Sequence, residues 1–174
     1  MTILKPPSQL DCRWLEECIE ICDGPSVYVE ELGVRATFRN PDRKQIRKIQ
    51  YDGCFNKTLS VSQADYIVGE TGKLDVIVEL KSSDTNIKEA ARQVDHTLHA
   101  WRQSSIAYPK IAGLIIYGRI EAKKKRAGRV PRANSMIETA ERDFLRTNKV
   151  LLLIREHGSV QFKFSDFLRK SDAR

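Results

Sequence analysis

The chain has no apolar run approaching the roughly 20 residues that a helix needs to cross a bilayer. Its N-terminal segment, MTILKPPSQLDCR, lacks the apolar core of a secretory signal. There is no P-loop and no G-x-G-x-x-G, which argues against a site for ATP or a dinucleotide, and a G-x-S-x-G nucleophile motif is also missing. We therefore expect a soluble, cytoplasmic protein that uses neither a nucleotide cofactor nor a serine nucleophile of that type.

Cysteine is sparse, and its spacing does not match a metal site. The four residues Cys12, Cys18, Cys22 and Cys54 contain no C-x-x-C pair, and no histidine lies near them in sequence. Cys18 and Cys22 are four residues apart, which would place both on one face of a helix. We expect buried, reduced thiols, as is usual for free cysteine in the cytosol.

Basic residues outnumber acidic ones. Lys and Arg number 30 against 23 Asp and Glu, and the net charge of +7 favours a polyanionic partner such as nucleic acid. Cationic side chains are concentrated in residues 119–135, and we expect this segment to contact phosphates without reading bases. A solvated loop is the alternative, and the shortage of nearby aromatics weakens a stacking model of single-strand binding. The residues expected to contact nucleic acid are Lys123, Lys124, Lys125, Arg126, Arg129 and Arg132.

Acids and a lysine stand out in the run ADYIVGETGKLDVIVELK, residues 64–81. Alternation along a strand places Glu79 and Lys81 on one face, about 7 Å apart, and the apolar Val76, Val78 and Leu80 on the other. A strand dominated by Val, Ile and Leu has no structural need for this Glu and Lys, because burying charge without partners is costly. An ordinary Glu79–Lys81 ion pair on an exposed strand is the alternative.

Asp65 at a strand start, followed after one hairpin by Glu79-Leu80-Lys81, resembles the motif of the PD-(D/E)xK, or restriction-endonuclease-like, nuclease superfamily. The segments TFRNP, IQYDGC, VELKSSD and QVDHT resemble small uncharacterised prokaryotic proteins of that superfamily. The resemblance implies Mg²⁺ or Mn²⁺ held by Asp65, Glu79 and the Leu80 carbonyl, since Mg²⁺ takes few protein carboxylates and keeps several waters. It also implies that Lys81 orients or activates the attacking water. Gln93, on the helix predicted after the motif, is a catalytic candidate by the same resemblance, or alternatively a polar flank of that helix.

Further acids are candidates for the site. In this superfamily a helix-borne Glu near the N-terminus often joins the metal ligands, and Glu16, Glu17 and Glu20 compete for that role. Asp52 and Asp75 are reserve carboxylates, although Asp75 lies about 13 Å along the strand from the acid of the E-x-K triplet.

The order of the predicted elements indicates an α/β fold. The resemblance implies a central mixed β-sheet flanked by helices with a restriction-endonuclease-like core, namely a leading helix, a three-strand meander that carries the site, a crossover helix and a further strand. We expect residues 1–174 to form a single domain. Capping boxes at Asn86 with Glu89, and at Ser135 with Glu138, predict two helix starts. The predicted helices are 8–22, within 82–103, and 135–147, and the predicted strands are 26–32, 34–38, 46–54, 64–69, 74–81, 108–118, 150–156 and 160–164, the last two as a terminal hairpin.

Together these patterns predict a metal-dependent endonuclease that hydrolyses phosphodiester bonds, with DNA as the expected substrate. A second copy of the chain or a partner subunit is the candidate for reaching both strands. The alternative is a nuclease-fold module that binds nucleic acid without cutting it, as a subunit or regulator of a larger assembly. The intact set of Asp65, Glu79 and Lys81 favours the enzyme, whereas the lack of a separate specificity domain favours the binding module.

Overall fold

A computed structural model describes residues 12–57, 61–83, 86–118, 132–158 and 161–168, with the backbone alone for 132–134. Its larger sheet has seven strands, in the spatial order β1 (Cys12–Glu16), β2 (Ile19–Cys22), β5 (Ile46–Gln50), β6 (Tyr66–Glu70), β7 (Leu74–Lys81), β8 (Lys110–Tyr117) and β9 (Leu152–Glu156). The smaller sheet has the order β10 (Phe162–Lys163), β4 (Val34–Arg39) and β3 (Ser26–Glu31). The helices are α1 (Ile87–Trp101), α2 (Arg132–Asn148) and α3 (Phe164–Leu168).

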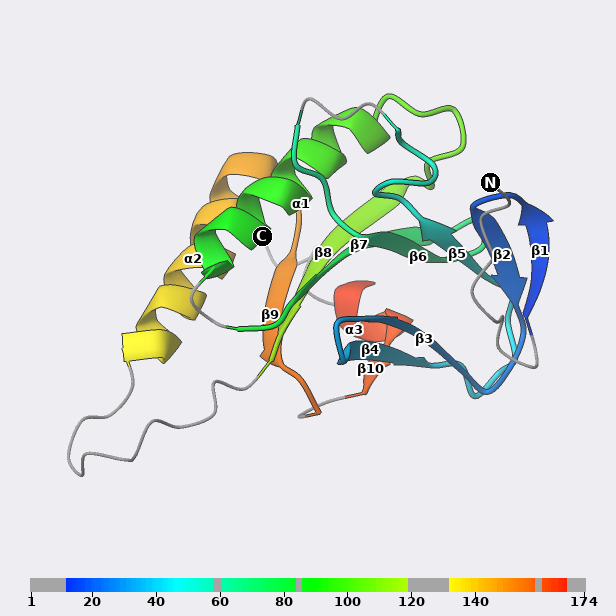
Figure 1. The fold of residues 1–174 in the computed structure, drawn as a ribbon, viewed down its shortest axis with the longest axis horizontal. Helices are drawn as coiled ribbons and strands as arrows, with labels where there is room; N and C mark the ends of the chain where they lie inside the picture. Colours follow the sequence, from blue (N-terminus) through cyan, green and yellow to red (C-terminus); the bar gives the residue numbers. More distant parts are fainter. Residues whose placement is uncertain (1–11, 58–60, 84–85, 119–131, 159–160, 169–174) are drawn as a thin grey trace.

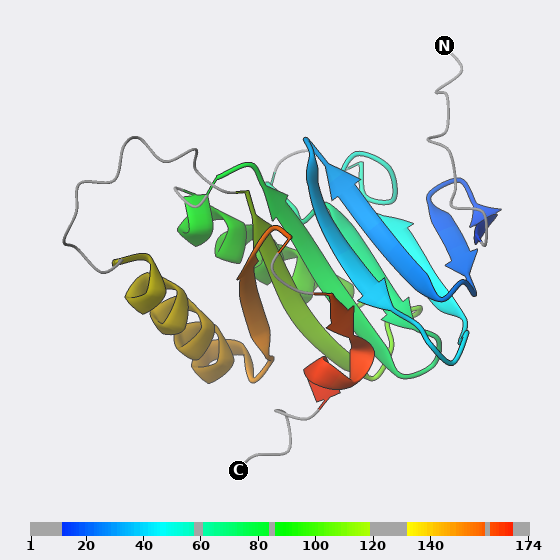
Figure 2. The ribbon, with the colours of Figure 1, turned by 90° about the horizontal axis from the view of Figure 1, so that it is seen from below.

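These elements are stacked in layers. Helices α1 and α2 cover one face of the large sheet, and the small sheet with α3 lies against the other face (Figure 1). Seen from below, β3 and β4 lie in front of the large sheet (Figure 2). Side chains of β7 enter both interfaces, because Val76, Val78 and Leu80 pack toward the small sheet while Ile77 packs toward α1. The predicted α/β class with a mixed sheet is thereby confirmed, and β7 reads as a continuous apolar run because it is covered on both faces.

The part of the fold around residues 46–117 follows the predicted order. Strands β5, β6 and β7 form an antiparallel meander, and α1 connects β7 to the parallel strand β8. Helix α1 forms because its apolar residues recur at helical spacing and bury one face against the sheet. The predicted capping box is wrong at this start, since the Asn86 side chain makes no capping hydrogen bond and Glu89 pairs with Arg92. Among the described residues, no helix is long and apolar enough to span a membrane.

The helix predicted for residues 8–22 is wrong over the described part of that range. Residues 12–22 form the antiparallel hairpin β1–β2, and β2 pairs in turn with β5. Ile19 and Ile21 are β-branched and favour this extended pairing, whereas the helical reading rested on the spacing of apolar residues alone. Pairing with β5, far along the chain, outweighs the local pattern.

The prediction of reduced thiols is also wrong for this structure. Cys12 is bonded to Cys22 across the β1–β2 hairpin, and Cys18 is bonded to Cys54 in the loop after β5. The antiparallel register places Cys12 directly opposite Cys22, with their Cα atoms 4.1 Å apart. The expected helix had hidden this relationship, because it placed Cys18 and Cys22 on a common face instead.

The C-terminal segments do not form the predicted hairpin. Strand β9 adds to the large sheet parallel to β8, whereas β10 pairs parallel to β4 in the small sheet. The two strands therefore belong to different layers. Phe162, Phe164 and Phe167 instead pack with Phe38, so the end of the described chain closes the core beneath the large sheet. Helix α2 begins at Arg132, three residues before the predicted start at Ser135.

Candidate active site

The ends of two neighbouring strands bring Asp65 and Glu79 together. Tyr66 at the start of β6 pairs with Val78 on β7, so the preceding residue, Asp65, lies across from Glu79. The backbone N–H of Leu80 donates a hydrogen bond to Oδ2 of Asp65 at 2.7 Å. The aspartate therefore turns toward the end of β7, as the predicted site requires.

Lys81 completes this group. Its Nζ lies 2.5 Å from Oε1 of Glu79, whose side chain is 1% exposed, and the lysine side chain is 22% exposed. Among the described residues neither Glu79 oxygen accepts a hydrogen bond of good geometry. Buried carboxylate oxygens without such partners are costly. An additional cation beside Glu79 would supply the missing interactions, so the donor set fits a hard divalent ion.

Both carboxyl groups hold their protons unusually tightly. Burial raises the pKa of Asp65 from its ordinary 3.8 to about 9, with a further contribution from the charge of Glu79 and opposition from the Leu80 hydrogen bond. Burial likewise raises the pKa of Glu79 from 4.5 to about 7, while the neighbouring charge of Lys81 opposes the rise. Paired acids with raised pKa values are a feature of functional sites, because a bound cation offsets the repulsion between them.

Glu31 belongs to the same acidic group, although sequence reasoning missed it. It ends β3 in the other sheet, and its carboxyl group reaches the side chain of Asp65, where its charge further raises the pKa of Asp65. Its charge also raises the pKa of Glu79. Nothing local marks this residue, because the contact depends on how the small sheet is placed against the large one.

Helix α1 holds the segment that leads into Asp65. Nε2 of Gln93 donates a hydrogen bond to the Gln63 carbonyl at 3.0 Å, and Oγ1 of Thr97 accepts one from the Ala64 N–H at 2.8 Å. Gln93 is buried, and its amide oxygen has no hydrogen-bond partner among the described residues. The hydrogen bond observed for Gln93 therefore positions the main chain before Asp65.

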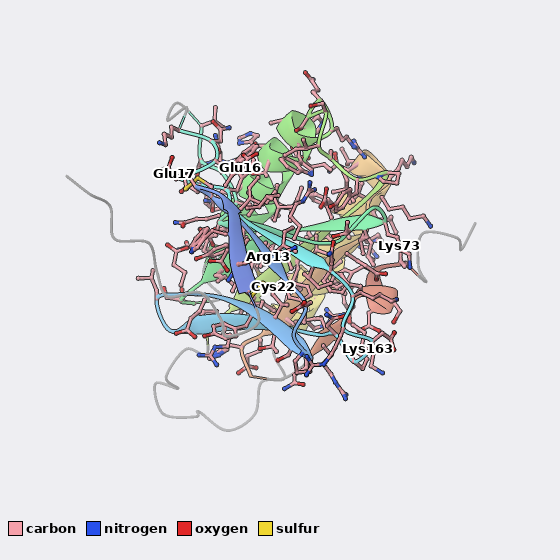
Figure 3. The ribbon with its side chains drawn as sticks, turned by 90° about the vertical axis from the view of Figure 1, so that its right-hand side faces the viewer. Arg13, Glu16, Glu17, Cys22, Lys73 and Lys163 are labelled. Atoms are coloured by element: carbon pink, nitrogen blue, oxygen red, sulfur yellow. A yellow bond between two sulfur atoms is a disulfide. The ribbon has the colours of Figure 1, made fainter. Side chains whose placement is uncertain are left out.

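The competing N-terminal acids have different positions. Glu20 on β2 is buried, and its Oε2 lies 2.8 Å from Nζ of Lys48. Glu16 and Glu17 are exposed at the turn of the β1–β2 hairpin, at the surface seen in Figure 3. Glu20 is therefore the one buried acid of the three, on a strand rather than the predicted helix.

The two reserve carboxylates have different environments. Asp75, at the other end of β7, is fully buried and accepts hydrogen bonds from Arg47 at 2.9 and 3.1 Å, from Nε1 of Trp101 at 2.8 Å and from the Tyr108 N–H at 2.8 Å. This arrangement satisfies the carboxylate with protein partners and gives it a structural role. Asp52 is exposed in the loop after β5, and its N–H donates a hydrogen bond to the Asp65 carbonyl at 3.4 Å.

A geometric group of potential metal ligands occurs elsewhere. Cys12, Glu20 and Cys22 bring three potential ligand atoms within 4.8 Å of one another. Among the described residues, this is the group of Cys, His, Asp or Glu side chains that meets that distance. Because the two sulfurs are bonded to each other, they are not thiolate ligands. A magnesium site at Asp65 and Glu79 needs fewer protein acids than this geometric criterion demands, since Mg²⁺ commonly takes one or two.

The cationic side chains predicted to bind nucleic acid lie outside the described residues. These are Lys123, Lys124, Lys125, Arg126, Arg129 and the side chain of Arg132, whose backbone begins α2. The described chain before them ends at Gly118, whose N–H donates a hydrogen bond to the Lys81 carbonyl at 2.7 Å. A side chain at this glycine would collide with the Ser82 carbonyl, since its Cβ would lie 2.4 Å away. The chain therefore leaves β8 in close contact with the end of β7.

Comparison of the chain with family models, with curated proteins and with solved structures gives no match. The site must be interpreted from its own geometry.

Proposed function

We propose that this protein is a metal-dependent endonuclease with a restriction-endonuclease-like core, cleaving phosphodiester bonds in DNA. The single observation that carries the proposal is the convergence of a buried Glu79, its ion partner Lys81 and the anchored Asp65 at one end of the β6–β7 hairpin. A structural ion pair does not explain this arrangement, because Lys81 supplies one positive charge beside two acids, the buried Glu79 and the half-buried Asp65.

The roles of the side chains follow from their positions. Asp65 and Glu79 would hold Mg²⁺ or Mn²⁺, with the Leu80 carbonyl as a third protein ligand. The ion supplies charge stabilisation at the phosphate and an activated water when it is bound. Lys81, partly exposed and next to Glu79, is placed to hold the attacking water and a phosphate oxygen. Gln93 would help to keep the segment before Asp65 in place.

The topology supports the same class. The meander β5–β6–β7, the helix α1 and the parallel strand β8 reproduce the order that the resemblance implies, with the acids on the second and third strands of the meander. The hairpin β1–β2 is a departure from that pattern, because it takes the place of the expected leading helix.

Charge supports a nucleic-acid substrate. The chain carries a net charge of +7, and the cationic segment follows Gly118, which contacts the site strand. Phosphate contacts of this kind would position DNA without specifying a sequence. A second copy or a partner subunit would bring a second site to the opposite strand, and a cytoplasmic location belongs to the same proposal.

The binding module without cleavage is supported by one observation. Among the described residues, Asp65, Glu79 and Glu31 do not bring three ligand atoms within 4.8 Å of one another, and Asp65 is already engaged by the Leu80 N–H. In that case the protein would bind nucleic acid and would not hydrolyse it with any divalent ion.

A plasmid-nicking assay separates these functions. Supercoiled DNA is incubated with the wild-type protein and Mg²⁺ or Mn²⁺, with EDTA as the metal-free arm, and DNA binding is measured in parallel by fluorescence anisotropy. Nicking that is lost with EDTA, with Asp65→Asn and with Lys81→Met supports the nuclease. The exposed loop variant Asp42→Asn is the matched control and is expected to cut normally. Binding without nicking in all arms would leave only the binding module.

A further inference from the structure

A cavity of about 370 Å³ lies between the β3–β4 hairpin and the β2, β5 and β6 edge of the large sheet. The aromatic side chains of Trp14, Tyr28 and Tyr66 line it, together with Glu20, Lys48 and Arg35. The Arg35 guanidinium lies over one face of the Tyr28 ring, 4.3 Å from its centroid. Its volume falls in the range of small-molecule sites. Rings and a few polar groups on one cavity wall are the composition of a site for a flat, hydrogen-bonding ligand.

The polar part of the cavity is an ion pair that water scarcely reaches. The side chains of Glu20 and Lys48 are 4% and 14% exposed, and their charged atoms lie 2.8 Å apart. A buried ion pair is weak evidence for stability, because desolvation offsets its attraction. Here it presents a hydrogen-bond acceptor next to a donor at the cavity wall. The polar edge of a nucleobase offers neighbouring donors and acceptors of the complementary kind.

The cavity adjoins the acids of the proposed active site through Glu31. This residue both lines the cavity and reaches the side chain of Asp65. The next residue, Leu32, also lines the cavity and is 82% exposed, with φ +50° in the left-handed region that a leucine seldom adopts. An exposed leucine held at the rim in this conformation has the position of an apolar wedge that replaces a displaced base in a stack.

We propose that this cavity binds one unpaired nucleobase of the strand whose phosphate lies at Asp65 and Glu79. The inference rests on the proposed function and narrows its substrate to nucleic acid with an unpaired nucleotide beside the cleaved bond. The base stacks on the rings of the cavity and bonds through its polar edge to Glu20 and Lys48, as in enzymes that act on extruded nucleotides.

Charge at the rim decides which part of a nucleotide enters. Three acids, Glu20, Glu30 and Glu31, line the cavity against two cations, Lys48 and Arg35, which are ion-paired to Glu20 and Glu30. The excess of one acid disfavours a phosphate inside the cavity and leaves the uncharged base as the group that can be buried. The phosphate then remains outside, where the cation held by Asp65 and Glu79 can meet it.

Photocrosslinking locates the base directly. A duplex with a single unpaired 5-iodo-deoxyuridine is bound to the full-length protein in Ca²⁺, irradiated and digested, and the linked peptides are sequenced by mass spectrometry. Crosslinks to peptides containing Trp14, Tyr28 or Tyr66 support the proposal. Crosslinks confined to other peptides overturn it. A duplex with the same nucleotide paired is the control and is expected to crosslink weakly at these rings.

Binding measurements test the energetic role of the cavity. In Ca²⁺, the wild-type protein is expected to bind the duplex with one unpaired base at least about fivefold more tightly than the fully paired duplex, since stacking on a ring is worth this much or more. Tyr28→Ala and Leu32→Ala are expected to reduce the preference to less than about twofold. Tyr28→Phe keeps the ring and should retain the preference. Leu15→Ala, at another exposed leucine outside the cavity, is the matched control.

These experiments separate the inference from the proposed function. Cleavage of plasmid with equal affinity for paired and unpaired duplexes would overturn the base site and leave the nuclease standing. A preference for the unpaired base that depends on Tyr28, with no cleavage in any divalent ion, would support the base site in a binding module and overturn the nuclease.

Discussion

The N–H of Leu80 holds Oδ2 of Asp65 at 2.7 Å. This bond directs the aspartate toward the end of β7, where Glu79 is already buried beside Lys81. Holding two acids in one poorly hydrated place costs stability in the absence of a cation, and burial raises the pKa of both. The arrangement is therefore better suited to binding positive charge than to stabilising the fold.

The first prediction concerns stability as a function of pH. Because the pKa of Asp65 is 3.8 in its ordinary state and about 9 in the folded protein, the folded chain binds more protons than the unfolded chain between these values. The free energy of unfolding of the metal-free protein should therefore fall as pH rises from about 4 to about 9. Asp65→Asn should remove much of this slope and raise Tm at pH 8, by about 2–4 °C for each kcal/mol gained.

Thermal unfolding in EDTA at several pH values checks this outcome, with Asp42→Asn as the control at an exposed aspartate. An Asp65→Asn protein that is less stable than wild type at pH 8, or that keeps the full pH slope, would show that Asp65 is not a destabilising acid.

The second prediction concerns divalent cations. Binding of Mg²⁺ or Mn²⁺ at Asp65 and Glu79 requires both groups to lose their protons, so affinity should increase with pH through the Glu79 pKa of about 7 and on toward the Asp65 pKa of about 9. Isothermal titration calorimetry with Mn²⁺ in buffers of different ionisation enthalpy measures both the affinity and the protons released. Affinity that is the same at pH 6 and pH 8, or unchanged in Glu79→Gln, would contradict a site at these residues.

Local patterns predicted α1 and the β6–β7 hairpin because their information is local. The buried residues of α1 recur every three or four positions, and the strands of the hairpin are adjacent in sequence. The alternation along β7 likewise predicted that Glu79 and Lys81 share a face. Local strand patterns were therefore enough to predict that Asp65, Glu79 and Lys81 lie close together.

The remaining features depend on distant contacts. The spacing of Trp14, Leu15 and Cys18 suits a helix as well as a strand, and pairing of β2 with β5 decides between them. Glu31 reaches Asp65 only because the two sheets pack face to face. The Cys12–Cys22 disulfide follows from the register of the β1–β2 hairpin, and the Cys18–Cys54 disulfide follows from the pairing of β2 with β5. The spacing of the cysteines in the sequence reveals neither.

The third prediction concerns Asp75, whose carboxylate is enclosed by Arg47, Trp101 and Tyr108. Asp75→Ala would leave the Arg47 charge buried without its partner, at a cost of about 3–5 kcal/mol. The double variant Arg47→Met with Asp75→Leu should be less destabilised than Asp75→Ala alone, because it removes both charges. Urea unfolding of the three proteins measures these differences. Equal stability of Asp75→Ala and wild type would contradict the structural role of the pair.

The fourth prediction concerns the disulfides. Replacing Cys18 and Cys54 by serine opens the link between the β1–β2 turn and the loop after β5, and should lower the free energy of unfolding by about 2–4 kcal/mol. The free thiols are alkylated without reductant and counted by mass spectrometry, both in protein as purified from cells and in protein that has first been reduced. Four free thiols in protein from cells, together with no loss of stability in the double serine variant, would restore the expectation of reduced cysteines.

The fifth prediction concerns Thr97, whose Oγ1 accepts a hydrogen bond from the N–H of Ala64, the residue before Asp65. Thr97→Val keeps the shape of the side chain but leaves that buried N–H without its acceptor, which costs about 1–3 kcal/mol. If the bond also positions Asp65, the variant should bind Mn²⁺ about tenfold more weakly, the lower end of the loss seen when supporting hydrogen bonds around a metal are removed. Thr97→Ser retains the acceptor and should recover most of that affinity. Calorimetry at a temperature where all three proteins are folded separates the two effects, because a lower Tm with unchanged Mn²⁺ affinity would show that Thr97 supports the fold and does not position the site.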